Sequence, residues 1–423
     1  MWRNRIAWRL WAGAVFLALF AGRSGAQTSN TCIDCHSSLD PPLQVTADKF
    51  TADIHAQKGL GCTGCHGGDP SDPSMDAMSK ARGFRGKIDR KQIPALCGTC
   101  HANGDFMRQY NPSLRTDQLS QYGTSVHGKL LAKGDTRVAV CIDCHSVHDI
   151  RPSRDSRSTV HPLNVAQTCA RCHADPEHMK GYSIPTDQFA KYNTSVHHDA
   201  LVVRGDLSAP TCTTCHGNHG AAPPGVGAVH NVCSTCHVFQ DQMFQKSTHK
   251  AAFQAANLPG CVTCHSNHGI THATDAKLEA GPQGVCMQCH KPGDSCDQAR
   301  AAFLKGLTGL DEAIKDADRL LGVAESSGME VSQARLEEDQ ARDDLTKARV
   351  TIHSFRKELV DQDIQAGLNV TAKSLQGAQA ALAERDYRRK GLGISLIAIL
   401  AVVAGLWLYI RQIEPKSPGV SHR

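Results

Sequence analysis

Residues 122–150 read YGTSVHGKLLAKGDTRVAVCIDCHSVHDI, and residues 159–173 read TVHPLNVAQTCARCH. Each segment contains the pattern Cys-x-x-Cys-His, which begins at Cys141 in the first and at Cys169 in the second. The chain has 423 residues and 19 Cys, and 18 of these Cys belong to nine such patterns. The patterns start at Cys32, Cys62, Cys97, Cys141, Cys169, Cys212, Cys233, Cys261 and Cys286. A pattern repeated this often determines what the polypeptide folds around.

The spacing within the pattern matches the attachment of a c-type haem. Two thiols three residues apart can form thioethers with the two vinyl groups of one haem, and the adjacent His can bind the iron. Structural zinc and disulfides use Cys pairs without needing a His after every second Cys. We therefore predict nine covalent haem c groups. The second thiols are those of Cys35, Cys65, Cys100, Cys144, Cys172, Cys215, Cys236, Cys264 and Cys289, and the proximal ligands are His36, His66, His101, His145, His173, His216, His237, His265 and His290.

The patterns are organised in four similar units. They cover about residues 50–103, 122–175, 192–239 and 244–292, and each holds two patterns, while Cys32–His36 stands in front as a ninth. Further His recur at shared positions, so a second His ligand for every iron is available. We predict as distal ligands His55, His127, His197 and His249, His148, His219 and His268, and His161, His230 and His272; His178 and His198 are extra.

Three of these His follow a proximal His by three residues, as His148 follows His145. In a helical turn such residues point to the same side, whereas a distal ligand approaches iron from the opposite face of the ring. We expect His148, His219 and His268 to bind a neighbouring haem, or alternatively to cap a helix or bond a propionate. The first unit has Asp69 at this position, and the nearby Met75 and Met78 are expected to be plain apolar residues rather than iron ligands.

Composition indicates an unusual core. Aromatic residues are only 5% of the chain, and residues 32–290 provide little polypeptide per predicted haem. We predict a mainly α fold with much irregular loop over residues 27–296, whose core is packed haems. Cys296, outside the patterns, is predicted to be a free thiol, with a disulfide to a partner as the alternative.

Both ends of the chain indicate export and a membrane anchor. Residues 1–26 combine four Arg, an apolar stretch and small residues before Gln27, which fits a signal peptide; an uncleaved anchor is the alternative. Residues 391–410 carry no charge and are long enough to span a bilayer. The orientation would leave 411–423 as a cytoplasmic tail. The formal charge of +5 falls to near zero without the first 26 residues, which argues against nucleic-acid binding.

Residues 297–390 have a helical composition. Apolar residues recur at spacings of three and four, as at Leu307, Leu310 and Ile314. We expect two or three helices forming a coiled-coil-like stalk, with breaks at 326–328 and about 360–366, followed by one transmembrane helix. His353 lies beside the stripe and is predicted to be a core or surface residue, with contact to a haem as the alternative.

The paired motifs resemble the multihaem c-type cytochrome superfamily, especially the lineage of cytochrome c nitrite reductase and hydroxylamine oxidoreductase. The helices after the last haem are similar in layout to the C-terminal helices of that lineage. Two features depart from related families. The chain has no Cys-x-x-Cys-Lys, which usually marks the catalytic haem of the nitrite reductases, and its firm anchor is C-terminal, unlike that of the quinol-oxidising NapC/NirT family.

The resemblance implies electron transfer between the quinone pool and redox partners. We expect a membrane-anchored periplasmic electron carrier, single-pass, with its haem domain outside the cytoplasm and no catalytic residue. It would relay electrons between a quinone-linked membrane oxidoreductase and periplasmic or extracellular partners. The alternative is an oxidoreductase with one open haem that acts on a small nitrogen or sulfur compound such as nitrite or hydroxylamine. Assembly into a haem filament is a third and least expected reading.

Overall fold

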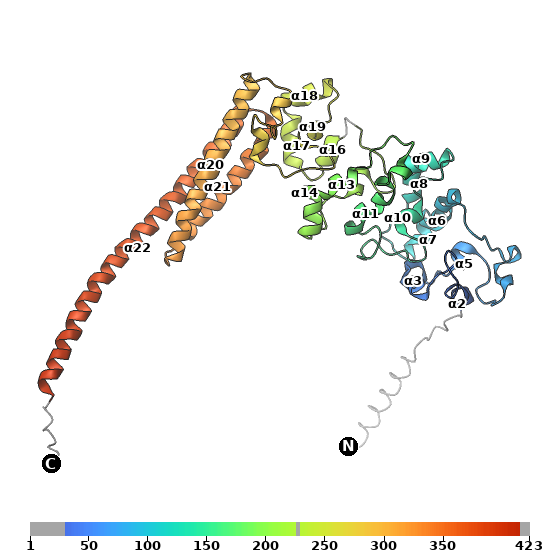
Figure 1. Ribbon diagram of the computed structural model, residues 1–423, viewed down its shortest axis with the longest axis horizontal. Coiled ribbons are helices and arrows are strands. Elements are labelled where there is room, and N and C mark those ends of the chain that lie inside the picture. Colours follow the sequence, from blue (N-terminus) through green and yellow to red (C-terminus); the bar gives the residue numbers. More distant parts are fainter. Residues whose placement is uncertain (1–29, 226–228, 415–423) are drawn as a thin grey trace, which may run out of the picture. The chain divides into compact units, whose positions relative to one another are not determined.

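The computed structural model describes residues 30–225 and 229–414 (Figure 1). The predicted signal peptide and residues 415–423 of the predicted tail lie outside the described residues. The chain divides into two compact units. One contains residues 30–190 and 197–223, and the other contains residues 191–196 and 224–414.

The first unit consists of short helices joined by irregular segments, and no strand occurs among its described residues. Most helices are far shorter than the length at which an isolated helix is stable in water. They are α2 (Thr31–His36), α3 (Ala47–Ala52), α4 (Ile54–Gln57), α5 (Thr63–His66), α6 (Ile93–His101), α7 (Gly104–Arg108), α8 (Gln118–Thr124), α9 (Val126–Ala132), α10 (Cys141–His145), α11 (Pro162–His173), α12 (Pro176–Met179) and α15 (Cys212–His216), with the single turns η1 (Met75–Met78), η2 (Lys80–Arg82) and η3 (Arg90–Gln92).

Apolar packing in this unit is sparse. One cluster joins α6 and α9 through Ile93, Leu131, Val138 and Val140. Arg90 ties the same region together, since its guanidinium donates to the Asp143 carboxylate at 2.6 Å and to the Val138 carbonyl at 2.9 Å. A mainly helical and irregular fold is confirmed for the described residues.

The second unit begins with similar short elements and ends in long helices. Helix α13 (Gln188–Asn193) and helix α14 (Val196–His198), which continues into the π-helical turn η4 (Asp199–Val203), include the residues at which the chain passes between the units. The remaining elements are α16 (Val229–Cys233), α17 (Val238–Gln245), α18 (Thr248–Ala255), α19 (Gly260–His265), η6 (Asp275–Leu278), η7 (Cys286–Gln288), α20 (Ser295–Ser326), α21 (Ser332–Thr351), η8 (Ile352–Ser354) and α22 (Lys357–Ile413).

Helices α20, α21 and α22 pack as a three-helix bundle with a conventional apolar core. The expected stripe is buried, with Leu307 and Leu310 fully buried at 0% exposure and Ile314 at 2%. Leu345 of α21 and Val360 of α22 complete the main cluster. The predicted spacing therefore identified the core face of α20 correctly.

The second helix break differs from its predicted place. Val360 and Ile364 are buried within α22, whereas the chain turns at 352–356. Phe355 adopts a left-handed conformation there, with φ at +56°. The apolar spacing of Phe355 and Leu359 fits a continuing helix, and the segment has no Gly or Pro, so the sequence pattern gave no sign of the turn.

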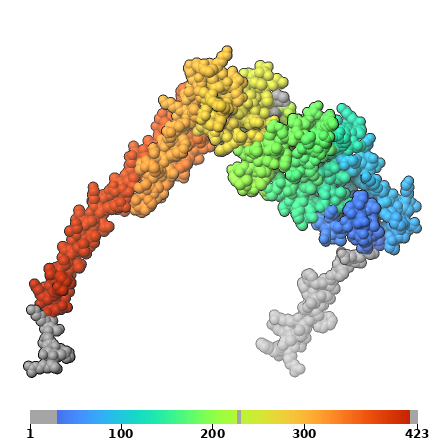
Figure 2. Space-filling view, viewed as in Figure 1, coloured from blue at the N-terminus to red at the C-terminus, as the bar shows by residue number. Residues whose placement is uncertain are grey.

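Helix α22 continues without interruption from the bundle through residues 391–410. An 18-residue window of it has a mean hydropathy of 2.4, and none of that window is buried. Beyond the bundle this helix has no neighbour within the described residues, as Figure 2 shows for its red end. By length and composition alone, α22 can cross a membrane.

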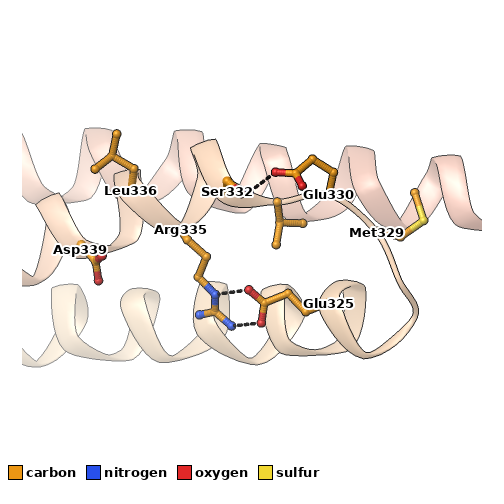
Figure 3. A pocket seen from close by; sticks show the side chains of 8 residues that line it. Glu325, Met329, Glu330, Ser332, Arg335, Leu336 and Asp339 are labelled. Carbon is orange, nitrogen blue, oxygen red and sulfur yellow. Dashed lines mark hydrogen bonds and ion pairs between the residues drawn. The ribbon is translucent and has the colours of Figure 1, made fainter.

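Ion pairs join the helices at the α20–α21 turn, which is the end of the bundle nearer residues 391–410. Figure 3 shows Arg335 of α21 facing Glu325 at the end of α20, with both nitrogen–oxygen contacts at 2.8 Å. Arg335 also contacts Glu338, whose side chain is buried. Arg335 also pairs with Asp318 of α20 at 2.6 Å, so these ion pairs join α20 to α21 beside the turn between them.

Candidate functional site

The Cys-x-x-Cys-His patterns lie on short helices that end at or near the proximal His. Seven helices end at that residue: α2, α5, α6, α10, α11, α15 and α19. In one helical turn the two Cys, three residues apart, lie on one side. Each pattern therefore presents two sulfur atoms together, with an imidazole beside them.

A buried polar residue precedes the candidate distal His before the first pattern of each repeat. Asp53, Ser125, Ser195 and Ser247 each precede such a His by two residues, and all four are at most 8% exposed. The Ser125 hydroxyl donates to the Tyr122 carbonyl at 2.6 Å and accepts from the Gly128 amide at 2.9 Å. The Asp53 carboxylate likewise accepts from the His55 amide at 2.8 Å, so Asp53 and Ser125 fix the start of α4 and α9 and with it the direction of the following His.

Among the described residues, six pairs of imidazole rings lie at nearly constant separation. Their ring centroids lie 6.0–6.2 Å apart. Each pair joins one proximal His to one His outside the patterns. The pairs are His55–His101, His66–His148, His127–His173, His145–His219, His249–His290 and His265–His353.

This separation fits two imidazoles bound to one iron. A His nitrogen lies about 2 Å from a metal it binds, and roughly 1 Å from its own ring centroid, so two ligands on opposite sides have centroids about 6 Å apart. Two neutral imidazoles in ordinary van der Waals contact would not need to keep that distance in all six places. The donor set therefore fits a haem iron with His on both faces.

Hydrogen bonds leave the Nε2 atoms of several rings for a metal. The Nδ1 atom of His66 lies 3.1 Å from the Gly86 carbonyl, that of His353 lies 2.9 Å from the Val350 carbonyl, and that of His55 lies 3.0 Å from the Asp53 carboxylate. An Nδ1–H donor leaves Nε2 as the free lone pair. Such partners orient a ligand ring before the metal binds.

Burial favours the form of these rings that binds iron. Removal from water lowers the pKa of His145 and of His265 to about 4. It also lowers the pKa of His127, His219 and His353. These imidazoles are therefore neutral at neutral pH, as metal ligation requires.

The pairs follow a rule of position within the repeats. Here a unit means one of the four sequence repeats. The His before the first pattern pairs with the proximal His of the second pattern in its own repeat, as His55 does with His101. The His three residues after a proximal His pairs with the first pattern of the preceding unit, as His148 does with His66. The expectation that these His serve a neighbouring haem stays a prediction, and the ring pairs place His148 and His219 beside a proximal His of the preceding repeat.

The turn that carries these His is not helical, contrary to the premise of that expectation. Helix α10 ends at His145, and Ser146 and His148 then take positive φ values of 70° and 65°. The chain leaves the helical conformation instead of completing another helical turn. The ring of His148 lies beside that of His66, and the helical spacing argument does not apply.

Backbone hydrogen bonds join successive repeats beside the paired rings. The amide before each distal His donates to the carbonyl two residues after the His of the following unit. These bonds are Ile54 to Ile150 at 2.8 Å, Val126 to Ala221 at 3.0 Å and Val196 to Ile270 at 2.9 Å. Each junction thus positions ligands of two haem sites at once.

The attachment points of consecutive patterns also lie close together. The thiols of Cys97 and Cys169 donate hydrogen bonds to the sulfur atoms of Cys141 and Cys212, respectively, and these bonds are the main causes that raise the pKa of Cys97 and Cys169. A contact between Cys233 and Cys261 has the same effect in the second unit, where it raises the pKa of Cys261. Haems attached at these sulfur atoms would be near neighbours.

The remaining predicted ligands do not belong to the six ring pairs given above. His161 is buried, and its Nδ1 accepts from the Leu163 amide at 3.3 Å, so it caps α11. His272 is exposed, and the side chain of His230 is outside the described part. His197 and His268 each interact with other residues of the chain. Asp69 bonds to Ser71 and Arg82, and Met75 is exposed.

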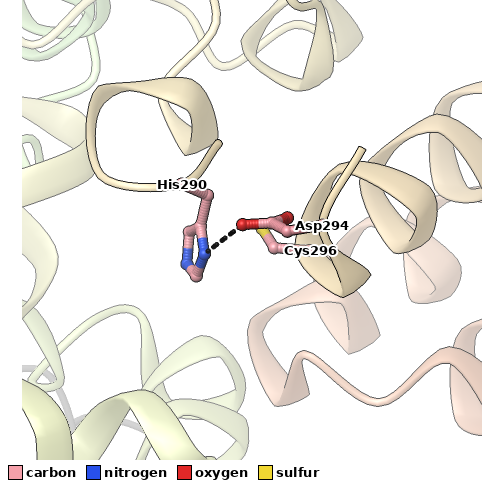
Figure 4. Close-up of side chains that lie close together, drawn as sticks. All are labelled: His290, Asp294 and Cys296. Carbon is pink, nitrogen blue, oxygen red and sulfur yellow. Dashed lines mark ion pairs between the residues drawn. The ribbon is translucent and has the colours of Figure 1, made fainter. Parts of the chain in front are cut away.

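The site of His290 includes two residues of the bundle. Figure 4 shows Asp294 beside His290, with Oδ2 3.4 Å from Nδ1, and Cys296 next to them. Asp294 also caps α20 by accepting from the Asp297 amide at 2.8 Å. Burial raises the pKa of Cys296 to about 11, so it is a thiol at neutral pH. The cluster belongs to the candidate haem site of His290.

His353 faces a proximal His, although the sequence predicted a core or surface residue there, with contact to a haem as the alternative. It lies in η8 outside every repeat, and its ring stacks at 19° and 6.0 Å from that of His265. The repeat pattern could not identify it, because no pattern residue follows at a fixed distance. A missing distal partner for the fourth unit was the signal that could have drawn attention to it.

Comparisons with known proteins indicate similarity to multihaem c-type cytochromes. Residues 54–174 match the model of the cytochrome c3 family. An 84-residue segment is 31% identical to the C-type polyheme cytochrome OmcC of Geobacter sulfurreducens. That match covers 19% of this chain and only 10% of the relative. No solved structure matches the chain.

Proposed function

We propose that the chain is a multihaem electron carrier of the cytochrome c3 type, in which nine covalent haems form a relay. The six ring pairs with centroids 6.0–6.2 Å apart carry this proposal, because they provide a ligand on each side of an iron. The family match over residues 54–174 supports covalent haem. The count of nine rests on the intact Cys-x-x-Cys-His patterns.

The polypeptide contributes position and rigidity to this relay. A bound haem iron supplies the chemistry by alternating between the ferric and ferrous states. Paired imidazoles, fixed by buried caps such as Ser125, would hold the iron from two sides and would limit structural change on electron transfer. Contacts between attachment sites, as at Cys97 and Cys141, keep the electron path short. No substrate chemistry is required of the side chains.

We further propose that the protein is exported and anchored by α22. Residues 1–26 have the composition of a signal peptide, and residues 391–410 would cross the membrane. The haem region would then lie in the periplasm, on the outer side of the cytoplasmic membrane. This location suits a protein whose haems are attached after export.

The length of the bundle limits which redox partner can reach the sites at its membrane-distal end. Between Lys357 and Lys390, α22 is about 50 Å long at 1.5 Å per residue. The sites of His265 and His353 lie at the far end of this segment from the proposed membrane span. A quinone within the bilayer could not reach them directly. We therefore favour exchange at these sites with a redox protein, such as a quinone-linked membrane complex that extends from the membrane.

The full-length protein, matured in a host competent for c-type haem attachment, tests the proposal. We expect haem to remain bound after denaturation, and electron paramagnetic resonance to show predominantly low-spin ferric haem. A paired variant, Cys97→Ser with Cys100→Ser, should contain one haem fewer than the parent. Haem that is lost on denaturation, or an unchanged haem count in the variant, would contradict the proposal. A high-spin signal that shifts with nitrite or hydroxylamine would favour the oxidoreductase alternative.

A further inference from the structure

In the repeats, the His three residues after a proximal His faces a proximal His of the preceding repeat. This pairing leaves one candidate iron site of the last repeat without a His from a following repeat. His66 and His145, in the first patterns of the first two units, face His148 and His219 of the next unit. His265 is the equivalent residue of the fourth unit, and no fifth repeat follows it. In its place the chain continues into the helical bundle.

The turn at the top of the bundle supplies an imidazole in the same arrangement. The rings of His265 and His353 are 6.0 Å apart and inclined by 19°, close to the 6.0 Å and 12° of His145 and His219. The Nδ1 atom of His353 is held by the Val350 carbonyl at 2.9 Å, which presents Nε2 to the facing ring.

The likeness extends to the residue two positions further on. In the repeats, Ile150 lies two residues after His148 and contacts the segment of the distal His55 through the Ile54 amide. In the bundle, Phe355 lies two residues after His353, and its ring lies 3.8 Å from that of the distal His249. Both turns contain a residue with positive φ, His148 at 65° and Phe355 at 56°.

We infer that residues 353–355 take the place of the turn that a following repeat would provide, so that His353 is the sixth ligand of the iron bound by His265. The inference rests on the proposed function, since it presupposes haem at Cys261 and Cys264. The bundle is then the terminal cap of the repeats, a role that solenoid proteins give to atypical end repeats. It also connects one haem directly to the helix that enters the proposed membrane span.

The test is His353→Ala in the full-length, haem-loaded protein. We expect one haem to change from low spin to high spin in electron paramagnetic resonance, and added imidazole to restore the low-spin signal. His178→Ala is the matched control, because His178 lies outside the six ring pairs, and it should retain the parent spectrum. An unchanged spectrum for His353→Ala would overturn the inference.

A second variant covers the case in which His353→Ala does not accumulate. Met is a known axial ligand of haem and raises the reduction potential relative to His. His353→Met should therefore keep the iron low-spin and raise the potential of one haem. Potentials identical to those of the parent would overturn the inference. Failure of the proposed function itself is distinguishable, because the parent protein would then contain no covalent haem.

Discussion

The bundle and the repeats differ in how their chain is held. In the bundle, long helices bury Leu307, Leu310 and Ile314 almost completely. Between residues 30 and 290 the helices are short, and the described apolar cluster of the first unit is built around four residues. The repeats instead bring together imidazoles and thiols. The difference teaches that one chain can combine a region stabilised by apolar burial with a region that has little apolar core of its own.

Removal of haem should have the largest effect, because it should destabilise the repeats and leave the bundle folded. Full-length protein produced without haem attachment should lose protection from hydrogen exchange across residues 30–290, because helices of this length are unstable alone. Amides of α20 and α21 should stay protected by their apolar core. Mass spectrometry of peptic fragments would measure both. Equal protection of the repeats with and without haem would show that they have a sufficient core of their own.

A smaller effect is expected from a cavity in the bundle. Leu310 is fully buried, so Leu310→Ala should destabilise the bundle by about 2–5 kcal/mol. Leu336→Ala, at a side chain that is 63% exposed, should change stability by no more than about 0.5 kcal/mol. Denaturant unfolding followed by circular dichroism would compare them, with haem absorbance as a separate probe of the repeats. Similar losses for both variants would mean that the assigned core face is wrong.

A still smaller effect is expected from a helix cap in the repeats. Ser125→Ala removes a buried hydroxyl that bonds to Tyr122 and Gly128, which should cost about 1 kcal/mol. The low-spin signal of the haem at His127 and His173 should weaken on mild denaturation before that of the other haems. Ser113→Ala, at an exposed loop position, is the control. No difference between the two variants would argue against the cap as the device that positions His127.

The smallest effect concerns the contact between the two regions of the second unit. Phe355→Leu removes the ring stacked on His249 but keeps an apolar side chain. We expect a modest shift in the potential of the haem at His290, whose facing ligand is His249, with the haem count unchanged. Spectroelectrochemical titration would detect it. A shift as large as that of His353→Met would mean that Phe355 acts on the ligation itself.

The sequence predicted the helical stripe of α20 and two of the three classes of His outside the patterns as ring partners, because both depend on local spacing. The third class, which includes His161, was predicted as distal ligands, but His161 caps α11. The sequence could not predict which ring meets which, since this depends on the non-helical turn at Ser146 and His148 and on contacts between successive repeats. It also misplaced the turn before α22, where Phe355 fits the apolar spacing yet leaves the helical conformation. His353 was undecided for the same reason, because its partner is almost 90 residues earlier in the chain.

The intact mass of the purified, haem-matured protein tests the central claim most directly. The account predicts a mass that exceeds that of the processed polypeptide by nine haem groups, retained under denaturing conditions. A mass equal to that of the polypeptide alone would contradict it, because paired imidazoles without covalently bound iron could not carry electrons along the chain.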